Sequence, residues 1–399
     1  MNYLFIHQNF PGQFVHLSQA LAERPGNRVV ALAMNKNPAP AKVEVHHYNL
    51  LRRPAEQVHP MLQDMESKVL RGEACAAKAM QLKHSGFTPD IIVAHPGWGE
   101  PLFLKDVFPR AKVVMYCEFF YGMEGRDVGF DPELPQMTFD KQCILRLKNN
   151  ANLHALDIAD AAISPTEWQK STYPAWAHNK ISVIHDGIRS DRLQPRADAR
   201  IRLGREGQLQ EFGPGAEILT YVARNLEAVR GFHIFMRSLP HILKKRKKAR
   251  VVVVGGDDVS YGARLPGNLT WREHMLREVG EGIDLSRVHF VGKVPYGTYL
   301  DLLQVSKVHA YWTTPFVLSW SFLETAISGA PLIASATQPV LEFAEELGVR
   351  TVGFFDHKGF AEAICEELAR PPVARQAKFL QRIEHDWCLQ RQLDLLAQL

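Results

Sequence analysis

Two arginines flank one short loop in the second half of the chain, and their chemistry suits a phosphate-bearing ligand. Arg224 follows the apolar run Glu217–Ala223, and Arg230 stands just before a segment with the apolar spacing of a helix. A guanidinium group makes paired hydrogen bonds to phosphate oxygens, and the amino end of a helix adds partial positive charge. The loop therefore predicts a diphosphate clamp. A pair of ordinary surface arginines is the alternative.

Glu324 is a second candidate, because the residues around it at 322, 323, 326 and 327 are apolar. A carboxylate in such surroundings needs a partner or faces a ligand. Pro315 and Gly329 bound a short helix here, and Ser319 or Ser321 is available as its N-cap. The alternative is a solvated glutamate on an exposed helix face.

His95 closes an apolar strand and opens the sequence HPGWGE, which adds glycines, Trp98 and Glu100 within a few residues. The next strand ends in Glu118, followed by three aromatic rings. A carboxylate and an aromatic surface together suit a hydroxylated ligand, and His95 is the candidate for polarising an approaching hydroxyl. A structural histidine beside an aromatic core is the alternative.

Apolar strands alternate with helical segments through both halves of the chain, which is typical of parallel sheets with right-handed crossovers. Residues 190–215 are polar and rich in turn formers. We therefore expect an α/β protein with two Rossmann-like domains, their parallel sheets facing an interdomain cleft. The predicted boundaries are 1–190 for the first domain, 191–215 for a linker region, 216–373 for the second domain and 374–399 for a final helical segment.

Composition narrows the class of protein. A length of 399 residues suits two domains, and no apolar run is long enough to span a membrane. With no leader pattern at Met1, we expect a cytoplasmic protein. The five cysteines are scattered, which predicts neither disulfides nor a zinc site, and a net charge of +4 is too small to indicate nucleic acid. The basic run Lys244–Arg250 suits a helix end, and peripheral contact with the inner face of a membrane stays open.

The stretch Tyr311–Ser335 resembles the nucleotide-sugar site of retaining glycosyltransferases of family 4, whose usual pattern is E-x7-E. Glu324 matches the second glutamate, whereas Phe316 stands in the place of the first, which holds the donor sugar in that family. The resemblance covers most of the chain, most strongly 217–345, and extends to HQNFPGQF near the amino end. It implies the GT-B architecture, in which the final segment crosses back to the first domain.

The resemblance also implies an activity. It is a retaining transfer of a sugar from a nucleotide-diphosphate sugar to the hydroxyl of a carbohydrate, lipid-linked or other acceptor, in surface polysaccharide or glycoconjugate synthesis. Arg224 and Arg230 would neutralise the diphosphate, and His95 would serve the acceptor. The nucleotide-sugar contacts would be Glu324 on the ribose, the main chain of Lys293 and Val294 on the base, and Gly12, Val317, Leu318 and Ser319.

No cofactor is expected beyond the donor substrate. No Asp-x-Asp sequence stands near the arginine loop, and Asp257–Asp258 alone is a weak indication of a cation site, so we expect no metal. Two other interpretations stay open. One is a nucleotide-sugar epimerase or hydrolase of the same fold, and the other is a nucleotide-sugar-binding protein without catalysis, which Phe316 favours.

Overall fold

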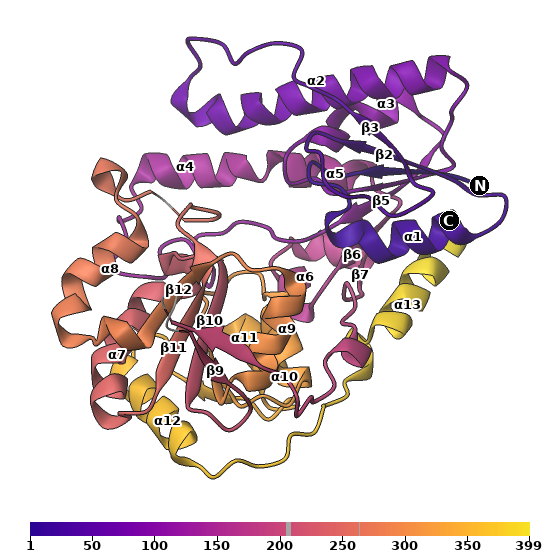
Figure 1. The fold of residues 1–399 in the computed structure, drawn as a ribbon. Coiled ribbons are helices and arrows are strands. Elements are labelled where there is room, and N and C mark those ends of the chain that lie inside the picture. The colour runs from indigo at the N-terminus through magenta and orange to yellow at the C-terminus, as the bar shows by residue number, and fades with distance from the viewer. Residues whose placement is uncertain (205–208, 263) are drawn as a thin grey trace. The chain divides into compact units, whose positions relative to one another are not determined.

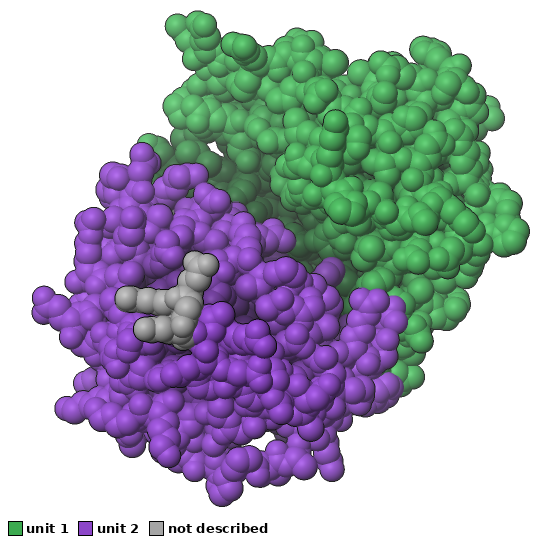
Figure 2. All heavy atoms as spheres, in the orientation of Figure 1, with its two compact units in different colours: residues 1–187, 381–399 green, residues 188–380 purple. Residues whose placement is uncertain are grey.

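The computed structural model describes residues 1–204, 209–262 and 264–399, and these residues divide into two compact units. Unit 1 comprises residues 1–187 and 381–399, and unit 2 comprises residues 188–380 (Figure 2). Residues 205–208 of the expected linker region lie outside the described residues. The last segment of the chain is therefore part of unit 1.

Unit 1 is built on a parallel sheet (Figure 1). In the part of the chain that the structure describes, its strand order is β3-β2-β1-β4-β5-β6-β7. The order reverses at the centre, where β1 lies between β2 and β4. The strands are β1 (Asn2–Ile6), β2 (Arg28–Ala33), β3 (Glu44–His47), β4 (Ile91–Ala94), β5 (Lys112–Tyr116), β6 (Ala161–Ser164) and β7 (Ile181–Val183).

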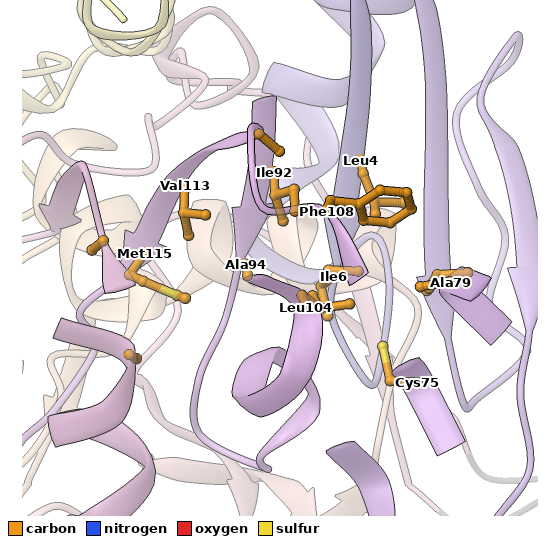
Figure 3. Close-up of a cluster of buried hydrophobic side chains, with 14 of the residues drawn as sticks. Leu4, Ile6, Cys75, Ala79, Ile92, Ala94, Leu104, Phe108, Val113 and Met115 are labelled. Carbon is orange, nitrogen blue, oxygen red and sulfur yellow. The ribbon is translucent and has the colours of Figure 1, made fainter. Parts of the chain in front are cut away.

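Helices cover both faces of this sheet. They are α1 (Val15–Glu23), α2 (Gln63–His84), α3 (Leu104–Val107), α4 (Phe139–Lys148), α5 (Asn150–Ile158), α6 (Glu167–Ser171) and α13 (His385–Ala397). Because side chains alternate along a strand, Leu4 and Ile6 pack in one cluster with Cys75 of α2 (Figure 3). Phe5 points to the opposite face, where the cluster includes Leu393 of α13. Both faces of β1 are thus buried, as its continuous apolar sequence predicts.

Unit 2 repeats the plan. Its described strands form a parallel sheet in the order β12-β11-β10-β13-β14-β15, and the order reverses between β10 and β13. The strands are β10 (Ile218–Asn225), β11 (Arg250–Gly256), β12 (Val288–Gly292), β13 (Val308–Tyr311), β14 (Leu332–Ser335) and β15 (Arg350–Val352). A small antiparallel pair, β8 (Ile201–Leu203) and β9 (Gln210–Phe212), precedes them. The helices are α7 (Phe232–Lys245), α8 (Trp271–Val279), α9 (Tyr296–Val305), α10 (Trp320–Ile327), α11 (Gln338–Ala344) and α12 (His357–Ala369).

Two parallel sheets with helical crossovers confirm the predicted α/β class. Ser319 is the N-cap of α10, as its position after Pro315 predicts. Helix α11 begins at Gln338, with Pro339 in its first turn, where the fixed φ of proline is tolerated. No helix among the described residues is long and apolar enough to cross a membrane.

Candidate functional site

In unit 2 the loops that follow β10 and β13 start at neighbouring strand ends, at the point where the strand order reverses. Open parallel sheets bind ligands at such points. After β10 a single helical turn, Ala228–Arg230, leads through Gly231 into α7. Gly231 has a φ of 62°, and a Cβ there would lie 2.3 Å from the Trp312 side chain. Only glycine at 231 allows the two loops to pack this closely.

Arg230 is buried and reaches from the first loop to the second. Its Nη1 donates to Thr313 Oγ1 at 3.0 Å and to the Val317 carbonyl at 2.9 Å. The ring centroids of Tyr261 and Phe316 lie 5.4 and 5.5 Å from its guanidinium carbon, within cation–π range. Its Nε and Nη2 have no partner among the described residues. One edge of a fixed guanidinium group is therefore free to bind an anion.

Arg224 differs from Arg230 in its surroundings. It lies near the end of β10 with its side chain exposed, and it makes no side-chain hydrogen bond or ion pair with any described residue. Of the two arginines predicted to form a clamp, Arg230 is thus fixed by its contacts, whereas Arg224 is exposed and has no such contact with a described residue.

Residues 316–319 form the turn between β13 and α10. Phe316 is buried, and its ring packs on Tyr261 with centroids 4.8 Å apart. Ser319 caps α10, and its amide donates to the Tyr311 hydroxyl at 2.9 Å. The amides of Val317 and Leu318 donate no hydrogen bond to any described residue. The turn therefore offers two backbone donors beside the Arg230 guanidinium.

Glu324 lies on α10 and is 8% exposed. Its two carboxylate oxygens accept hydrogen bonds from the hydroxyls of Tyr296 at 2.7 Å and Tyr299 at 2.9 Å, both on α9. Burial raises the pKa of Glu324, and the two tyrosine hydroxyls oppose the shift. Since a carboxylate has about four acceptor positions, further hydrogen bonds remain available. Sequence reasoning missed both tyrosines, although their spacing places them on one face of a helix.

The residues expected at the base follow β12. Lys293 is exposed and Val294 partly exposed, and Gly292 turns the chain before them with a φ of 67°. A Cβ on Gly256, at the end of the adjacent strand β11, would lie 2.8 Å from Lys293 Cε. The structure therefore places Lys293 against the end of β11, while its contacts connect it to neither Arg230 nor Glu324.

In unit 1 a second polar group occupies the equivalent reversal point of the sheet, between β1 and β4. His7 follows β1, His95 follows β4, and Glu118 follows β5. Gln13 links them, because His7 Nε2 and Gln13 Oε1 are 2.9 Å apart and Gln13 Nε2 donates to Glu118 Oε1 at 2.9 Å. His95 Nε2 makes a longer contact of 3.4 Å with Glu118 Oε2.

Backbone amides fix the direction of this His7–Gln13–Glu118–His95 array. The Asn9 amide donates to His7 Nδ1 at 2.9 Å, and the Gly97 amide donates to His95 Nδ1 at 3.1 Å. Both rings then carry their proton on Nε2, which points along the array toward Glu118.

The array also sets the charge on its members. Burial, with a contribution from His95, lowers the pKa of His7 to about 3, so His7 is neutral. Burial alone would raise the pKa of Glu118. The contacts with His95, His7 and Gln13 lower it by more, so the net shift of the Glu118 pKa is downward. The partly exposed Glu118 is therefore ionised at neutral pH.

Gly12, expected at the nucleotide sugar, lies beside this array. It has a φ of 49°, and a Cβ there would lie 2.6 Å from the His7 ring. The structure thus brings Gly12 and His95 together through His7, whose ring centroid is 5.3 Å from that of His95. Within unit 2, Arg230 contacts Val317. Glu324 is instead hydrogen-bonded to Tyr296 and Tyr299.

Both units match glycosyltransferase family models. Residues 25–193 match the model described as glycosyl transferase family 4 group, and residues 216–370 match the model described as glycosyl transferases group 1. These matches support glycosyl transfer as the class of reaction. No curated protein matches the chain in sequence.

Solved glycosyltransferase structures share the fold along the whole chain. A sucrose-phosphate synthase from Thermosynechococcus elongatus has a TM-score of 0.73 at 16% identity, covering 100% of this chain and 98% of its own. A UDP-forming trehalose-phosphate synthase from Burkholderia xenovorans has a TM-score of 0.69 at 15% identity, covering 99% and 98%. The corresponding enzyme from Burkholderia vietnamiensis has a TM-score of 0.64 at 16% identity, covering 99% and 97%. The predicted GT-B fold is confirmed.

Proposed function

We propose that this protein is a retaining glycosyltransferase that moves a sugar from a nucleotide-diphosphate sugar to an acceptor hydroxyl. The observation that carries the proposal is Arg230, a buried cation with one edge open, at the reversal point of the unit 2 sheet. Arg224 adds a second, exposed positive charge on the same loop. Such a pair suits a diphosphate better than any neutral ligand.

The chemistry proposed for unit 2 is stabilisation of the leaving group. As the bond between the anomeric carbon and the diphosphate breaks, negative charge grows on the phosphate oxygens. Arg230, already oriented, would receive that charge without reorganising, which is the efficient form of electrostatic catalysis. Arg224 would close on the diphosphate after binding, and the amides of Val317 and Leu318 would add neutral donors.

Retention follows if the acceptor reaches the same face of the sugar that the diphosphate leaves. The acceptor oxygen then bonds to the anomeric carbon, and its proton passes to the departing phosphate oxygen. Glu324 would hold the ribose hydroxyls, and Lys293 and Val294 would meet the base through their main chain. No step requires a metal, since the two arginines carry the neutralising charge, and Asp257 is paired with Arg272 at 2.6 Å.

For unit 1 we propose acceptor binding, with a carbohydrate, lipid-linked or other hydroxylated acceptor. His95 is buried, so it would act through the partly exposed Glu118, which accepts the hydrogen bond of an incoming hydroxyl. Gly12 would let a ligand approach the backbone after β1. Surface polysaccharide or glycoconjugate synthesis, with peripheral membrane contact in the cytoplasm, remains the proposed setting.

The deciding experiment is incubation of the full chain with a panel of labelled nucleotide sugars and hydroxylated acceptors. Transfer of label to an acceptor supports the proposal. Epimerised or hydrolysed nucleotide sugar without transfer would favour the epimerase or hydrolase alternative. Saturable binding without any product would favour a binding protein, the alternative that Phe316 suggests.

A further inference from the structure

Glu227 is a buried carboxylate that the proposed chemistry does not use. It lies in the loop between β10 and α7, three residues before Arg230, and is 1% exposed. Its Oε2 accepts hydrogen bonds from the amides of Tyr261 at 3.2 Å and Gly262 at 2.9 Å, and the Ser260 amide lies 3.3 Å from both of its oxygens. Three successive amides therefore converge on one side chain.

The loop that these bonds hold does not belong to the same stretch of sequence as Glu227. Residues 260–262 follow β11, and a second bond from Asn225 Nδ2 to Ser260 Oγ, at 2.7 Å, ties them to the end of β10. At Gly262 a Cβ would lie 3.2 Å from Glu227 Oε2, so the small residue allows the backbone to approach the carboxylate. Glu227 thus fixes where the loop after β11 lies.

The consequence concerns Arg230. Fixing residues 260–262 places the Tyr261 ring 5.4 Å from the guanidinium carbon of Arg230 and 4.8 Å from the Phe316 ring. The two rings and the Nη1 hydrogen bonds restrict the guanidinium to one orientation, which leaves Nε and Nη2 open. A cation that is already oriented loses less conformational entropy when an anion binds.

We infer that Glu227 is a positioning residue of the anion site: through residues 260–262 it holds Tyr261 against Arg230 and so presets the open edge of the guanidinium for a diphosphate. The inference rests on the proposed function for the identity of the anion. It gives Glu227 two opposing effects. Its charge lies near the anion and disfavours binding, whereas its hold on the loop favours binding, and positioning is the larger effect.

Because the two effects predict opposite changes in affinity, the direction of the change in a Glu227 variant shows which effect is larger. Pyrophosphate is the probe, because it carries the diphosphate without any choice of base or sugar, and calorimetry on the full chain measures its affinity. Glu227→Gln keeps the shape, removes the charge and weakens the amide contacts. We expect about tenfold weaker pyrophosphate binding. A loss of this size is similar to the contribution of one charge-assisted hydrogen bond. Tighter or unchanged binding would show that Glu227 acts as a charge or not at all, and would overturn the inference.

The matched control is Glu362→Gln, the same chemical change on an exposed carboxylate of α12 that pairs with Lys245. We expect no change in its pyrophosphate affinity. A loss equal to that of Glu227→Gln would mean that any lost carboxylate weakens binding, and would overturn the inference.

Tyr261→Leu keeps Glu227 and its hydrogen bonds but removes the ring that contacts Arg230. It therefore tests the positioning of Arg230 even if Glu227→Gln fails to fold. Its affinity should fall by a similar factor, and Tyr261→Phe, which keeps the ring, should lose less. Combining Glu227→Gln with Tyr261→Leu should cost no more than the larger single change, because both act through one loop. Fully additive losses would overturn the inference.

The same titrations separate this inference from the proposed function. If wild type binds pyrophosphate and Arg230→Met does not, the anion site stands whatever Glu227→Gln does. If wild type does not bind pyrophosphate, the site and the inference both fail.

Discussion

Units 1 and 2 place their polar side chains at the same point of the same kind of sheet, yet the charges differ. At the reversal point of unit 2 stands Arg230, a cation with unused donors. At the reversal point of unit 1, His7 contacts Gln13, Gln13 donates to the carboxylate of Glu118, and His95 lies 3.4 Å from the same carboxylate. The open donors of Arg230 suit an anion, whereas the carboxylate of Glu118 suits a hydroxyl donor.

One sheet architecture thus carries two different polar groups at the same position. A sheet reversal supplies a position for ligands but no preference among them. In unit 2 the preference comes from carbonyl and hydroxyl acceptors that hold one edge of a guanidinium. In unit 1 it comes from backbone amides that set the tautomers of two histidines.

Acid should destabilise unit 1 more than unit 2. Burial lowers the pKa of His7 and His185 in unit 1 and of His309 in unit 2 from 6.5 to about 3. Burial also lowers the pKa of His289 in unit 2, but not as far. Between these values the unfolded chain binds more protons than the folded one, so stability falls as pH drops from 6.5 toward 3. At the acid end of this range, the shifted pKa of each of His7, His185 and His309 lowers the free energy of unfolding by up to roughly 4 kcal/mol.

Hydrogen exchange measured separately for peptides of each unit, from neutral pH downward, checks this prediction. His309→Gln should flatten the dependence in unit 2 and leave unit 1 unchanged. Equal loss of protection in both units would contradict the contrast between them.

Arg230→Met should lower diphosphate affinity by roughly 3 kcal/mol, about a hundredfold, because it removes charged donors from a buried site. Stability should also fall, since the Val317 carbonyl loses its hydrogen bond. Calorimetry with nucleoside diphosphates and a melting curve measure the two effects. Arg237→Met, the same change on an arginine of α7 paired with Glu278, is the control and should leave affinity intact. Unchanged affinity in Arg230→Met would move the phosphate site elsewhere.

Arg224→Ala should weaken diphosphate binding by roughly 1.5 kcal/mol or more, about tenfold. The melting temperature without ligand should not move, because the side chain is exposed and has no partner among the described residues. The two substitutions should therefore differ: Arg230→Met should lower both diphosphate affinity and stability, whereas Arg224→Ala should lower affinity alone. A clear loss of stability in Arg224→Ala would remove the distinction.

Much of the fold could be predicted from local sequence. Apolar runs such as Val251–Val254 gave buried parallel strands, and Ser319 after Pro315 gave the start of α10.

The partners of the candidate residues could not be predicted in this way. Glu324 pairs with tyrosines 25 and 28 residues earlier, and Gln13 meets Glu118 across 105 residues. Tyr261 reaches Arg230 from a separate loop, the one that follows β11. Such contacts depend on the order of strands in the sheet, which periodicity within a short window does not encode. The residue types therefore indicated chemistry, but not which groups were already satisfied.

Glu324→Gln tests the buried carboxylate of unit 2 that is proposed to bind the ribose. The Tyr296 and Tyr299 bonds predict a loss of about 1 kcal/mol in stability, since charged acceptors bind hydroxyls more strongly than neutral ones. The proposed ribose contact predicts that preference for a nucleotide over its 2′-deoxy form shrinks as well. Tyr299→Phe is the control, and should lower the melting temperature while keeping that preference. A Glu324→Gln protein that retains the full preference would take Glu324 out of the nucleotide site.

The smallest expected effect is that of a chelator, and it bears directly on the contrast between the units. Leaving-group charge must be neutralised by something, and in this chain Arg230 and Arg224 are the candidates in unit 2. If they suffice, transfer measured in excess chelator should proceed at the rate seen without it. A site that depends on a cation would instead lose activity and regain it with magnesium or manganese. That outcome would mean that the arginines only position the diphosphate, and that the charge contrast between the two sheet edges is not what drives the reaction.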